Sequence, residues 1–246
     1  MKGMKLLYNP TGAAGEYGDI ALNIFDGCPH ACEYCYVPLV LKKERSTFHK
    51  VCDIRRESFT FFHLLRKDLE KIRNFGKSIF LCFTCDPFPY RRHDLCKLTI
   101  EVIKMIKEHG NHVTVLTKGE VDEDQFNIFD KDDTFGTTIS CDDYMAKKVE
   151  PNAYLPSQRL VQLSRIKIAT GCKTFVSCEP VYQPELIYNI ITRNNMVDEF
   201  RIGKLNYVKN DTDWAAFGKK AEYLCQLHNR GYMIKEGLRR EMDNGK

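Results

Sequence analysis

The chain alternates between short apolar runs of β type and longer amphipathic stretches of helical type along most of its 246 residues. Seven runs have the strand pattern: 19–25, 78–84, 112–117, 135–140, 173–178, 199–205 and, more weakly marked, 231–235. Five stretches have helical periodicity: 58–74, 94–109, 157–170, 184–193 and 213–229. Because a single helix between two strands forms a right-handed βαβ unit, we predict an α/β fold with a parallel sheet.

Boundary residues support the predicted helices. Ser58 and Asp213 are placed to cap helix N-termini, and Gly110 and Gly171 follow the ends of two helices. Six βα units with a further seventh strand predict an incomplete TIM-like (β/α)6 barrel, and a doubly wound sheet is the alternative. A chain of this length with 43% hydrophobic residues suits one domain spanning 1–246 better than two small ones.

Charge and cysteine content limit the class of protein. A formal net charge of +4 permits an anionic substrate without requiring one. Eleven cysteines, several inside apolar runs, do not match a small disulfide scaffold and predict a reducing compartment. There is no signal-peptide core near the N-terminus and no apolar stretch of 18 residues, so we expect a cytoplasmic protein without a membrane partner.

Polar and reactive side chains gather where the predicted strands end. They are Cys28; Thr84, Cys85 and Asp86; Thr117 and Lys118; Thr138, Ser140, Cys141 and Asp142; Glu179; and Lys204 and Asn206. Active sites of parallel α/β folds form at the carboxyl ends of strands, which predicts one shared site. The alternative is that chains turn polar wherever strands end.

The segment 27–36, Gly-Cys-Pro-His-Ala-Cys-Glu-Tyr-Cys-Tyr, directly follows the first predicted strand. Its thiols, Cys28, Cys32 and Cys35, have a spacing that suits three irons of a cubane iron–sulfur cluster, leaving the fourth iron open. A four-thiolate zinc site completed by Cys52, or by the pair Cys82 and Cys85, is the main alternative. Three ordinary buried cysteines are a further one.

The Cys-x3-Cys-x2-Cys motif with an aromatic residue before its third cysteine resembles the radical S-adenosylmethionine (SAM) superfamily. The longer pattern, from Asn23 and Phe25 through Tyr36, is similar to its spore photoproduct lyase-like branch, including small phage and bacterial relatives. The resemblance implies a 4Fe-4S cluster whose open iron is chelated by SAM. Reductive cleavage of SAM would then give a 5′-deoxyadenosyl radical that abstracts hydrogen from a substrate.

Other strand ends extend the resemblance. The segments 83–87, 116–118, 138–140, 149–151 and 159–160 look like family segments in the same order, and 178–181 and 203–206 match more weakly. By the resemblance, Lys118 would pair with the SAM carboxylate, although a solvated loop lysine is an equal alternative. Thr84 and Ser140 would hydrogen-bond the methionine or ribose end of SAM. Tyr34 would pack over the cluster and the adenine edge.

One position departs from the lyase pattern. Spore photoproduct lyase returns hydrogen from a cysteine at the position that is Phe83 here, and Cys82 would lie on the opposite face of its strand. Cys85 and Cys141 are the remaining candidate donors. The departure argues against thymine-dimer repair.

Basic clusters, including Arg91-Arg92-His93 after Pro87-Phe88-Pro89-Tyr90, would suit a phosphate backbone and stacked bases, with solvated surface charge as the alternative. His30, inside the cysteine loop, is expected to hydrogen-bond the loop backbone or tune the cluster.

We therefore predict a radical SAM enzyme with an external electron donor. A cavity lined by Asp86, Glu179, Lys204 and Asn206 would meet the substrate. Nucleic acid or a nucleotide-containing molecule is the first candidate substrate, and a peptide or protein is the second. The competing classes are a zinc-stabilised binding module and a cluster used for electron transfer or sensing alone.

Overall fold

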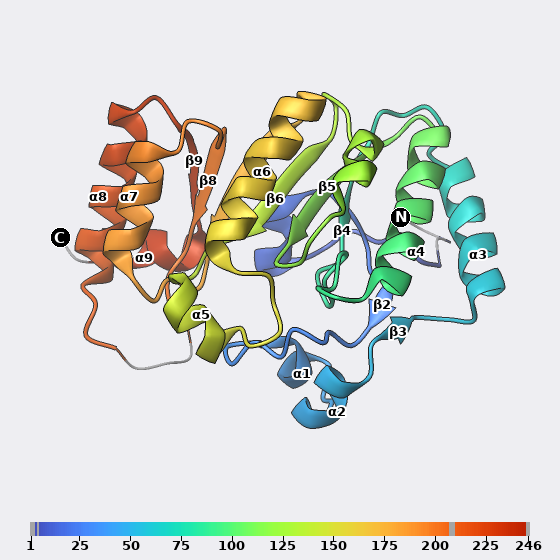
Figure 1. Ribbon diagram of the computed structural model, residues 1–246, viewed down its shortest axis with the longest axis horizontal. Coiled ribbons are helices and arrows are strands. Elements are labelled where there is room, and N and C mark those ends of the chain that lie inside the picture. Colours follow the sequence, from blue (N-terminus) through green and yellow to red (C-terminus); the bar gives the residue numbers. More distant parts are fainter. Residues whose placement is uncertain (1–2, 4, 207–209, 245–246) are drawn as a thin grey trace.

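A seven-stranded parallel sheet forms the centre of the protein (Figure 1). The computed structural model describes residues 3, 5–206 and 210–244. The strands, in their order across the sheet, are β1 (Ile20–Leu22), β4 (Ser78–Leu81), β5 (His112–Thr117), β6 (Thr134–Thr138), β7 (Lys173–Cys178), β8 (Glu199–Ile202) and β9 (Gly231–Ile234). Each corresponds to one of the predicted strands.

The strand order runs along the sheet in sequence without a reversal, and every neighbouring pair is parallel. A doubly wound sheet would reverse its order at a switch point, so that alternative is wrong. The sheet is open, with β1 at one edge and β9 at the other. The predicted partial barrel is confirmed, and so is its weakly marked seventh strand, β9.

Helices cover the outer side of the curved sheet (Figure 1). Those predicted are α3 (Ser58–Glu70), α4 (His93–Glu108), α6 (Pro156–Thr170), α7 (Pro184–Arg193) and α8 (Trp214–Leu227). The structure adds α1 (Val37–Val40), α2 (Arg45–Lys50), α5 (Asp143–Val149), α9 (Glu236–Asn244), the 3-10 turns η1 (Gly12–Tyr17) and η2 (Glu123–Ile128), and an antiparallel pair of short strands, β2 (Phe25–Asp26) and β3 (Asp53–Ile54). None of the helices in the described ranges is long and apolar enough to cross a membrane.

The helix caps correct one prediction. Glu57, not Ser58, caps α3, because its carboxylate accepts hydrogen bonds from the N–H groups of Phe59 and Thr60 at 3.0 Å. The prediction of Asp213 as the cap of α8 is confirmed by its 2.9 Å hydrogen bond from the Ala216 N–H.

The inner side of the sheet is filled by aromatic rings from distant parts of the chain. Tyr17, at the end of η1, packs edge-on against Phe80 of β4 and near Phe175 of β7, with ring centroids 5.3 and 6.4 Å away. Phe83 stacks on Phe80 at 4.1 Å. Gly136 of β6 leaves room for the Phe175 ring, because an added Cβ would lie 2.2 Å from it. The N-terminal segment thus closes part of the barrel interior.

The assignment of the chain to one domain spanning 1–246 stays a prediction.

Candidate active site

The cysteine segment 27–36 forms a loop between β2 and α1. It begins at Gly27, whose φ is +87° and whose Cβ, if it had one, would lie 1.8 Å from the carbonyl oxygen of Val51. Only glycine fits this position, for both reasons. The next residue, Cys28, donates its N–H to the carbonyl of Phe48 at 3.2 Å. The start of the loop is therefore fixed against α2 and the residues after it.

The three predicted ligands, Cys28, Cys32 and Cys35, are free thiols. Cys28 and Cys35 are half-buried, and Cys32 is 5% exposed. Burial raises the pKa of Cys32 to about 11 and, with the charge of Asp86, raises that of Cys28 well above its usual value. Since a cysteine binds metal as the thiolate, metal binding here would release protons.

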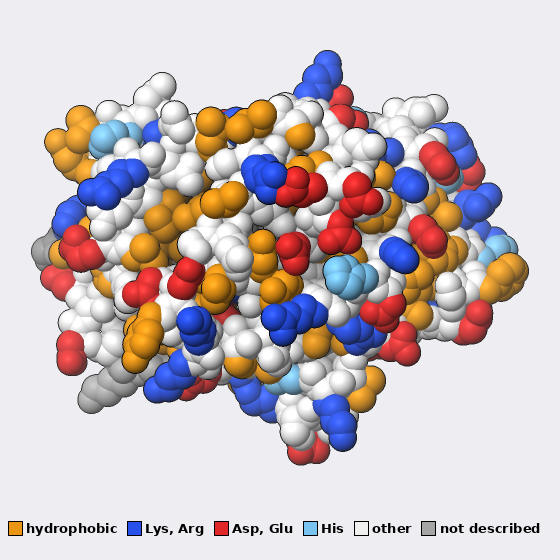
Figure 2. Space-filling model, viewed as in Figure 1, with side chains coloured by type: hydrophobic (Ala, Val, Ile, Leu, Met, Phe, Trp, Pro, Cys, Tyr) orange, Lys and Arg blue, Asp and Glu red, His pale blue; other side chains and the backbone are white. Residues whose placement is uncertain are grey.

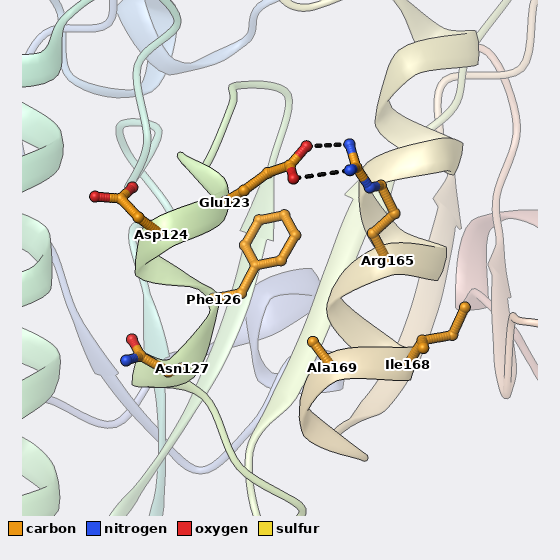
Figure 3. A pocket seen from close by; sticks show the side chains of 7 residues that line it. All are labelled: Glu123, Asp124, Phe126, Asn127, Arg165, Ile168 and Ala169. Atoms are coloured by element: carbon orange, nitrogen blue, oxygen red, sulfur yellow. Dashed lines mark hydrogen bonds and ion pairs between the residues drawn. The ribbon is translucent and has the colours of Figure 1, made fainter.

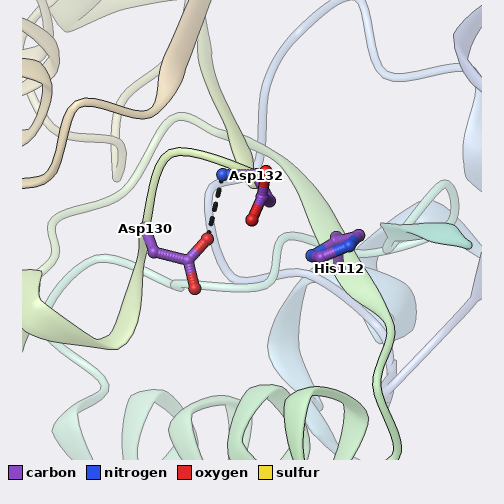
Figure 4. Close-up of side chains that lie close together, drawn as sticks. All are labelled: His112, Asp130 and Asp132. Carbon is purple, nitrogen blue, oxygen red and sulfur yellow. Dashed lines mark hydrogen bonds between the residues drawn. The ribbon is translucent and has the colours of Figure 1, made fainter. Parts of the chain in front are cut away.

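A compact set of possible metal ligands lies away from this loop. Four thiolates about 2.3 Å from one zinc lie only about 3.8 Å apart. Within residues 3, 5–206 and 210–244, the set of potential ligands whose atoms all lie within 4.8 Å of one another is His112, Asp130 and Asp132 (Figure 4). The three loop thiols do not form such a set.

The set in Figure 4 lies at the amino ends of β5 and β6, away from the strand ends that carry the loop. Asp130 accepts a 2.9 Å hydrogen bond from the N–H of Asp132 and pairs with the ammonium of Lys107 at 2.5 Å. The ammonium of Lys107 therefore already balances the negative charge of Asp130.

Asp86 lies beside the cysteine loop and pairs with His30 of that loop. Its carboxylate accepts hydrogen bonds from the hydroxyl of Thr117 at 2.5 Å and from the N–H groups of Phe88 and Lys118, both at 2.9 Å. Burial alone would raise its pKa, but His30, with Nδ1 3.4 Å away, and Lys118 lower it below its usual range. Asp86 is therefore an ionised carboxylate held by protein donors.

His30 ties the loop to two other segments. Its ring is fully buried, and its Nε2 accepts a 2.9 Å hydrogen bond from the N–H of Tyr90. Its carbonyl accepts from the N–H of Asn152 at 3.3 Å, and the Asn152 side chain donates to the carbonyl of Pro29 at 3.0 Å. The ring of His30 thus bonds to the backbone of Tyr90, outside the loop, where a bond to the loop backbone was predicted; its tuning of a cluster stays a prediction.

Glu150 is the centre of a buried polar network beside the loop. It is 2% exposed and accepts hydrogen bonds from the hydroxyls of Tyr34 and Ser140, the latter at 2.6 Å. The fully buried guanidinium of Arg159 donates to its other oxygen at 2.5 Å. Burial would raise the pKa of Glu150, but the charges of Arg159 and Lys118 outweigh burial and lower it. In this network the negative charge of Glu150 is balanced by the positive charges of Arg159 and Lys118.

The ammonium of Lys118 lies 6.0 Å from the centroid of the Tyr34 ring. Burial disfavours its charge, but Cys32, Glu150 and Asp86 hold its pKa above the usual value. Lys118 is therefore a half-buried cation near the Tyr34 ring, rather than a fully solvated loop lysine.

The structure brings three of the four predicted SAM contacts together. Tyr34, Lys118 and Ser140 all lie around Glu150. Thr84 belongs to a different contact, in which its N–H donates to the side-chain oxygen of Asn23 at 3.0 Å. Their roles in binding SAM stay predictions.

Sequence reasoning gave Arg45 no role at the site. From the first turn of α2, its guanidinium donates to the carbonyls of Cys35 at 2.9 Å, Glu33 at 2.7 Å, and Cys32. Three backbone acceptors in the cysteine loop thus converge on one side chain. A charge run in the sequence carries no signal for such a contact.

A second polar cluster lies at the ends of β7 to β9. Glu179 accepts a 3.1 Å hydrogen bond from Asn206 and pairs with the ammonium of Lys235 at 2.5 Å. Lys204, in contrast, pairs with Glu241. Of the four residues predicted to line a cavity, only Glu179 and Asn206 contact each other. The lysine that pairs with Glu179 is Lys235, not the predicted Lys204. The fourth, Asp86, lies at the cysteine loop instead.

Tyr17 connects this second cluster with the barrel interior. Its hydroxyl is 2.9 Å from that of Ser177, and the cationic groups of Lys235 and Arg201 lie 4.6 and 5.0 Å from its ring centroid. Burial raises the pKa of Tyr36 in the cysteine loop, and the neighbouring Cys35 adds to the rise.

The candidate hydrogen donors differ in position. Cys141 is fully buried, packs near Tyr34 and Tyr182, and has its sulfur 3.6 Å from the Ser140 hydroxyl. Cys85 is partly buried and packs against the main core. Burial raises the pKa of both thiols, that of Cys141 to about 11. Cys141 is thus the one that adjoins the Glu150 network.

A surface pocket lies elsewhere, between η2 and α6 (Figure 3). Its lining includes Phe126 and Ile168, and the Glu123–Arg165 ion pair spans it. It holds none of the predicted site residues.

Comparisons with known proteins bear on this geometry. No protein-family model matches the chain. The uncharacterized protein ORF301 of Acidianus two-tailed virus is 28% identical over 202 residues, which cover 76% of this chain and 64% of that protein. The chain therefore spans less than two thirds of the length of this curated relative.

Solved structures match more of the chain. Spore photoproduct lyase complexed with dinucleoside spore photoproduct has a TM-score of 0.69 at 13% identity, covering 95% of this chain and 79% of that one. Streptococcus suis SuiB bound to S-adenosylmethionine has a TM-score of 0.57 at 13% identity, covering 86% and 45%. SuiB bound to precursor peptide SuiA has a TM-score of 0.61 at 14% identity, covering 91% and 51%. The predicted resemblance is confirmed at the level of fold: the chain has the partial-barrel fold of these two radical SAM enzymes.

Proposed function

We propose that this protein is a radical SAM enzyme whose Cys28, Cys32 and Cys35 hold a 4Fe-4S cluster. The observation that carries the proposal is the loop itself: its three thiols are free, the half-buried cation Lys118 lies near them, and three separate segments, α2, Tyr90 and 149–152, anchor it. Soft thiolate ligands and a largely buried setting fit an iron–sulfur cluster. A reducing cytoplasm would keep the thiols available.

When bound, the cluster and SAM would supply the 5′-deoxyadenosyl radical through reductive cleavage. The chain's own residues would bind SAM and orient it. Lys118 offers a charged donor for the SAM carboxylate, and Tyr34 offers an apolar ring edge. Glu150 holds the hydroxyls of Tyr34 and Ser140 in fixed directions, which limits how SAM can lie. Burial of the loop excludes water from the metal.

Metal content tests the cluster directly. After anaerobic reconstitution, the wild type should contain about four irons and four acid-labile sulfides per chain. Alanine at Cys28, Cys32 or Cys35 should reduce this content strongly, whereas Cys96→Ala, which removes a half-buried thiol on α4, should not. One tightly bound zinc per chain with no sulfide would instead support the zinc-stabilised binding module.

We infer that the substrate is nucleic acid or contains a nucleotide. The support is a pair of surface tyrosines, Tyr90 and Tyr154, with ring centroids 5.1 Å apart and the guanidinium of Arg91 5.0 Å from the Tyr90 ring. The backbone N–H of Tyr90 donates to His30 of the cysteine loop, and the N–H of Tyr154 donates to the carbonyl of Lys118, so the tyrosine pair is tied to the candidate site. Aromatic rings beside an arginine suit stacked bases and a phosphate backbone.

Substitution of these tyrosines tests the substrate class. Stacking contributes about 1–3 kcal/mol per base, so Tyr90→Ala and Tyr154→Ala should each weaken binding of a short single-stranded DNA by about 5- to 100-fold. The measurement is fluorescence anisotropy of a labelled oligonucleotide. Tyr144→Ala, which removes an exposed tyrosine from α5, is the control and should bind normally. Equal binding by all four proteins would contradict the nucleic-acid assignment.

A peptide substrate is the second candidate. The support is the fold shared with SuiB, which one structure shows bound to its precursor peptide. The Glu179–Lys235 pair would offer a peptide both a carboxylate and an ammonium. If Tyr90→Ala and Tyr154→Ala bind the oligonucleotide as wild type does, the peptide becomes the favoured substrate.

A further inference from the structure

The outer side of α3 carries two exposed aromatic rings. Phe59 is 76% exposed, and its ring lies parallel to that of His63, which is exposed too. The ring centroids are 6.2 Å apart, and the angle between the ring planes is 7°. The inner side of the same helix is filled by Phe61 and Leu65, both fully buried. Phe59 and His63 therefore take no part in packing the core.

Basic side chains continue this side of the helix. Positions 59, 63, 66 and 67 recur at intervals of three and four residues, which places them on one side of an α-helix. Arg66 and Lys67 are exposed, as is Arg56 just before the helix, and among the described residues none of these three cations has an ion-pair partner. We call Arg56, Phe59, His63, Arg66 and Lys67 the α3 platform.

The acids near the α3 platform already have partners. Glu57 accepts two backbone N–H groups at the start of α3, and these hydrogen bonds lower its pKa. Glu70 pairs with Arg73 at 2.6 Å, and the buried Asp68 accepts three backbone N–H groups of the N-terminal segment. Figure 2 shows basic side chains, a histidine and a hydrophobic side chain at the right-hand edge, where α3 lies in Figure 1. The unpaired charge of this surface is therefore positive.

The chain segments that carry the α3 platform and the tyrosine pair contact each other. Arg92, two residues after Tyr90, donates to the carbonyl of Cys52 at 3.4 Å. The strand β3 follows Cys52, and the chain then passes directly to α3 (Figure 1). The segment with Tyr90 is thus fixed against the segment that leads into the α3 platform.

We infer that the α3 platform binds single-stranded nucleic acid, as a second contact for a substrate whose reacting nucleotide lies at the candidate site. The inference rests on the proposed function, because it takes nucleic acid as the substrate. Unpaired bases would stack on the parallel rings of Phe59 and His63, and phosphates would pair with the neighbouring cations. The α3 platform would thereby hold the strand while one nucleotide reacts elsewhere.

The composition of the α3 platform favours a single strand over a duplex or a protein partner. In a duplex the base faces are stacked on one another, so the rings of Phe59 and His63 could not reach them. Protein docking sites are built around a contiguous apolar patch, whereas the apolar ring of Phe59 is accompanied by a histidine and cations.

A stacking variant tests the rings. Phe59→Ala should weaken binding of a labelled single-stranded DNA of about 20 nucleotides by about 5- to 100-fold, as loss of one stacked base predicts. Fluorescence anisotropy with the full chain measures the affinity. The control, Tyr223→Ala, removes another exposed ring from a helix, α8, and should bind within two-fold of wild type. Phe59→Ala should also bind as much iron as wild type after reconstitution, because the cysteine loop is unchanged.

A charge variant tests the phosphate contacts. Each phosphate contact to a single strand adds about 0.7 to the slope of log affinity against log salt, so Arg66→Gln/Lys67→Gln should reduce that slope by about 1.4. The control, Arg193→Gln/Lys219→Gln, removes the same two side-chain types from exposed positions of α7 and α8, at the opposite end of the molecule in Figure 1. It should leave the slope unchanged.

Photo-cross-linking separates this inference from the proposed function. DNA that carries 4-thiothymidine should cross-link to α3 and to the segment around Tyr90, as located by mass spectrometry. Cross-links around Tyr90 with none on α3 would overturn the inference and leave the proposed substrate class standing. Equal binding by Phe59→Ala and Tyr223→Ala, with binding weakened in Tyr90→Ala, would do the same. Absence of DNA binding by the wild type would contradict the proposed substrate class itself, and the inference with it.

Discussion

Arg159→Met should lower the free energy of unfolding by about 3–5 kcal/mol, because it leaves a buried carboxylate without its main counter-charge. Arg159 is fully buried on α6, and its guanidinium donates to Glu150, to the Thr138 carbonyl at 2.9 Å and to the Tyr154 carbonyl at 2.5 Å. Methionine fills much of the same volume but donates nothing. Urea unfolding followed by circular dichroism measures the loss.

The same helix provides the control. Arg165 also pairs with a glutamate, Glu123, but both side chains are more than half exposed. Arg165→Met should therefore cost less than about 1 kcal/mol. The double variant Arg159→Met/Glu150→Gln should recover part of the loss, since the uncompensated charge is gone. Equal effects of Arg159→Met and Arg165→Met would contradict the role given to the buried pair.

The substitution Arg159→Met should also loosen the cysteine loop. Glu150 holds the Tyr34 hydroxyl, and the Val149 carbonyl accepts the N–H of Glu33 at 2.8 Å. A displaced Glu150 would release one side of the loop. Arg159→Met should therefore also bind less iron than Arg165→Met under identical reconstitution.

The repeating pattern of the sequence was sufficient to predict the sheet. Each strand is a compact apolar run, such as 78–81 or 173–178, and buried parallel strands produce runs of this kind. Long helices with one apolar face lie between most of them, so strand order followed from connection rules. The cysteine spacing similarly located the loop, because the ligand types and their intervals are local in sequence.

The contacts that order the loop could not be predicted in the same way. Arg45 looks like any member of a basic run, yet it donates to three loop carbonyls. Glu150 and Arg159 stood inside segments that resemble the family, but nothing local shows that they meet 2.5 Å apart. Lys235 pairs with Glu179 across 56 positions of sequence, replacing the lysine that was expected. Such partners are set by how α/β units pack, which a single sequence does not encode locally.

Short elements were missed for a related reason. The helices α1 and α2 span four and six residues, too few for a helical period to be visible. Their stability comes from tertiary contacts such as those of Arg45. Their contact with the cysteine loop therefore became visible only in three dimensions.

Cleavage of SAM should depend completely on the loop thiols. Cys32 is the most buried of the three thiols. Alanine there removes one cluster ligand, which leaves two thiols for a cluster that needs three from this loop. We expect loss of activity to the detection limit in Cys32→Ala and near-normal activity in Cys96→Ala.

The most direct test is an anaerobic assay of reconstituted wild type with dithionite and SAM, in which 5′-deoxyadenosine is quantified by chromatography. The account predicts 5′-deoxyadenosine from wild type and Cys96→Ala, and none from Cys32→Ala. An iron–sulfur spectrum without product under reduction would favour electron transfer or sensing over SAM chemistry. A colourless wild type that holds stoichiometric zinc and forms no 5′-deoxyadenosine would contradict the account.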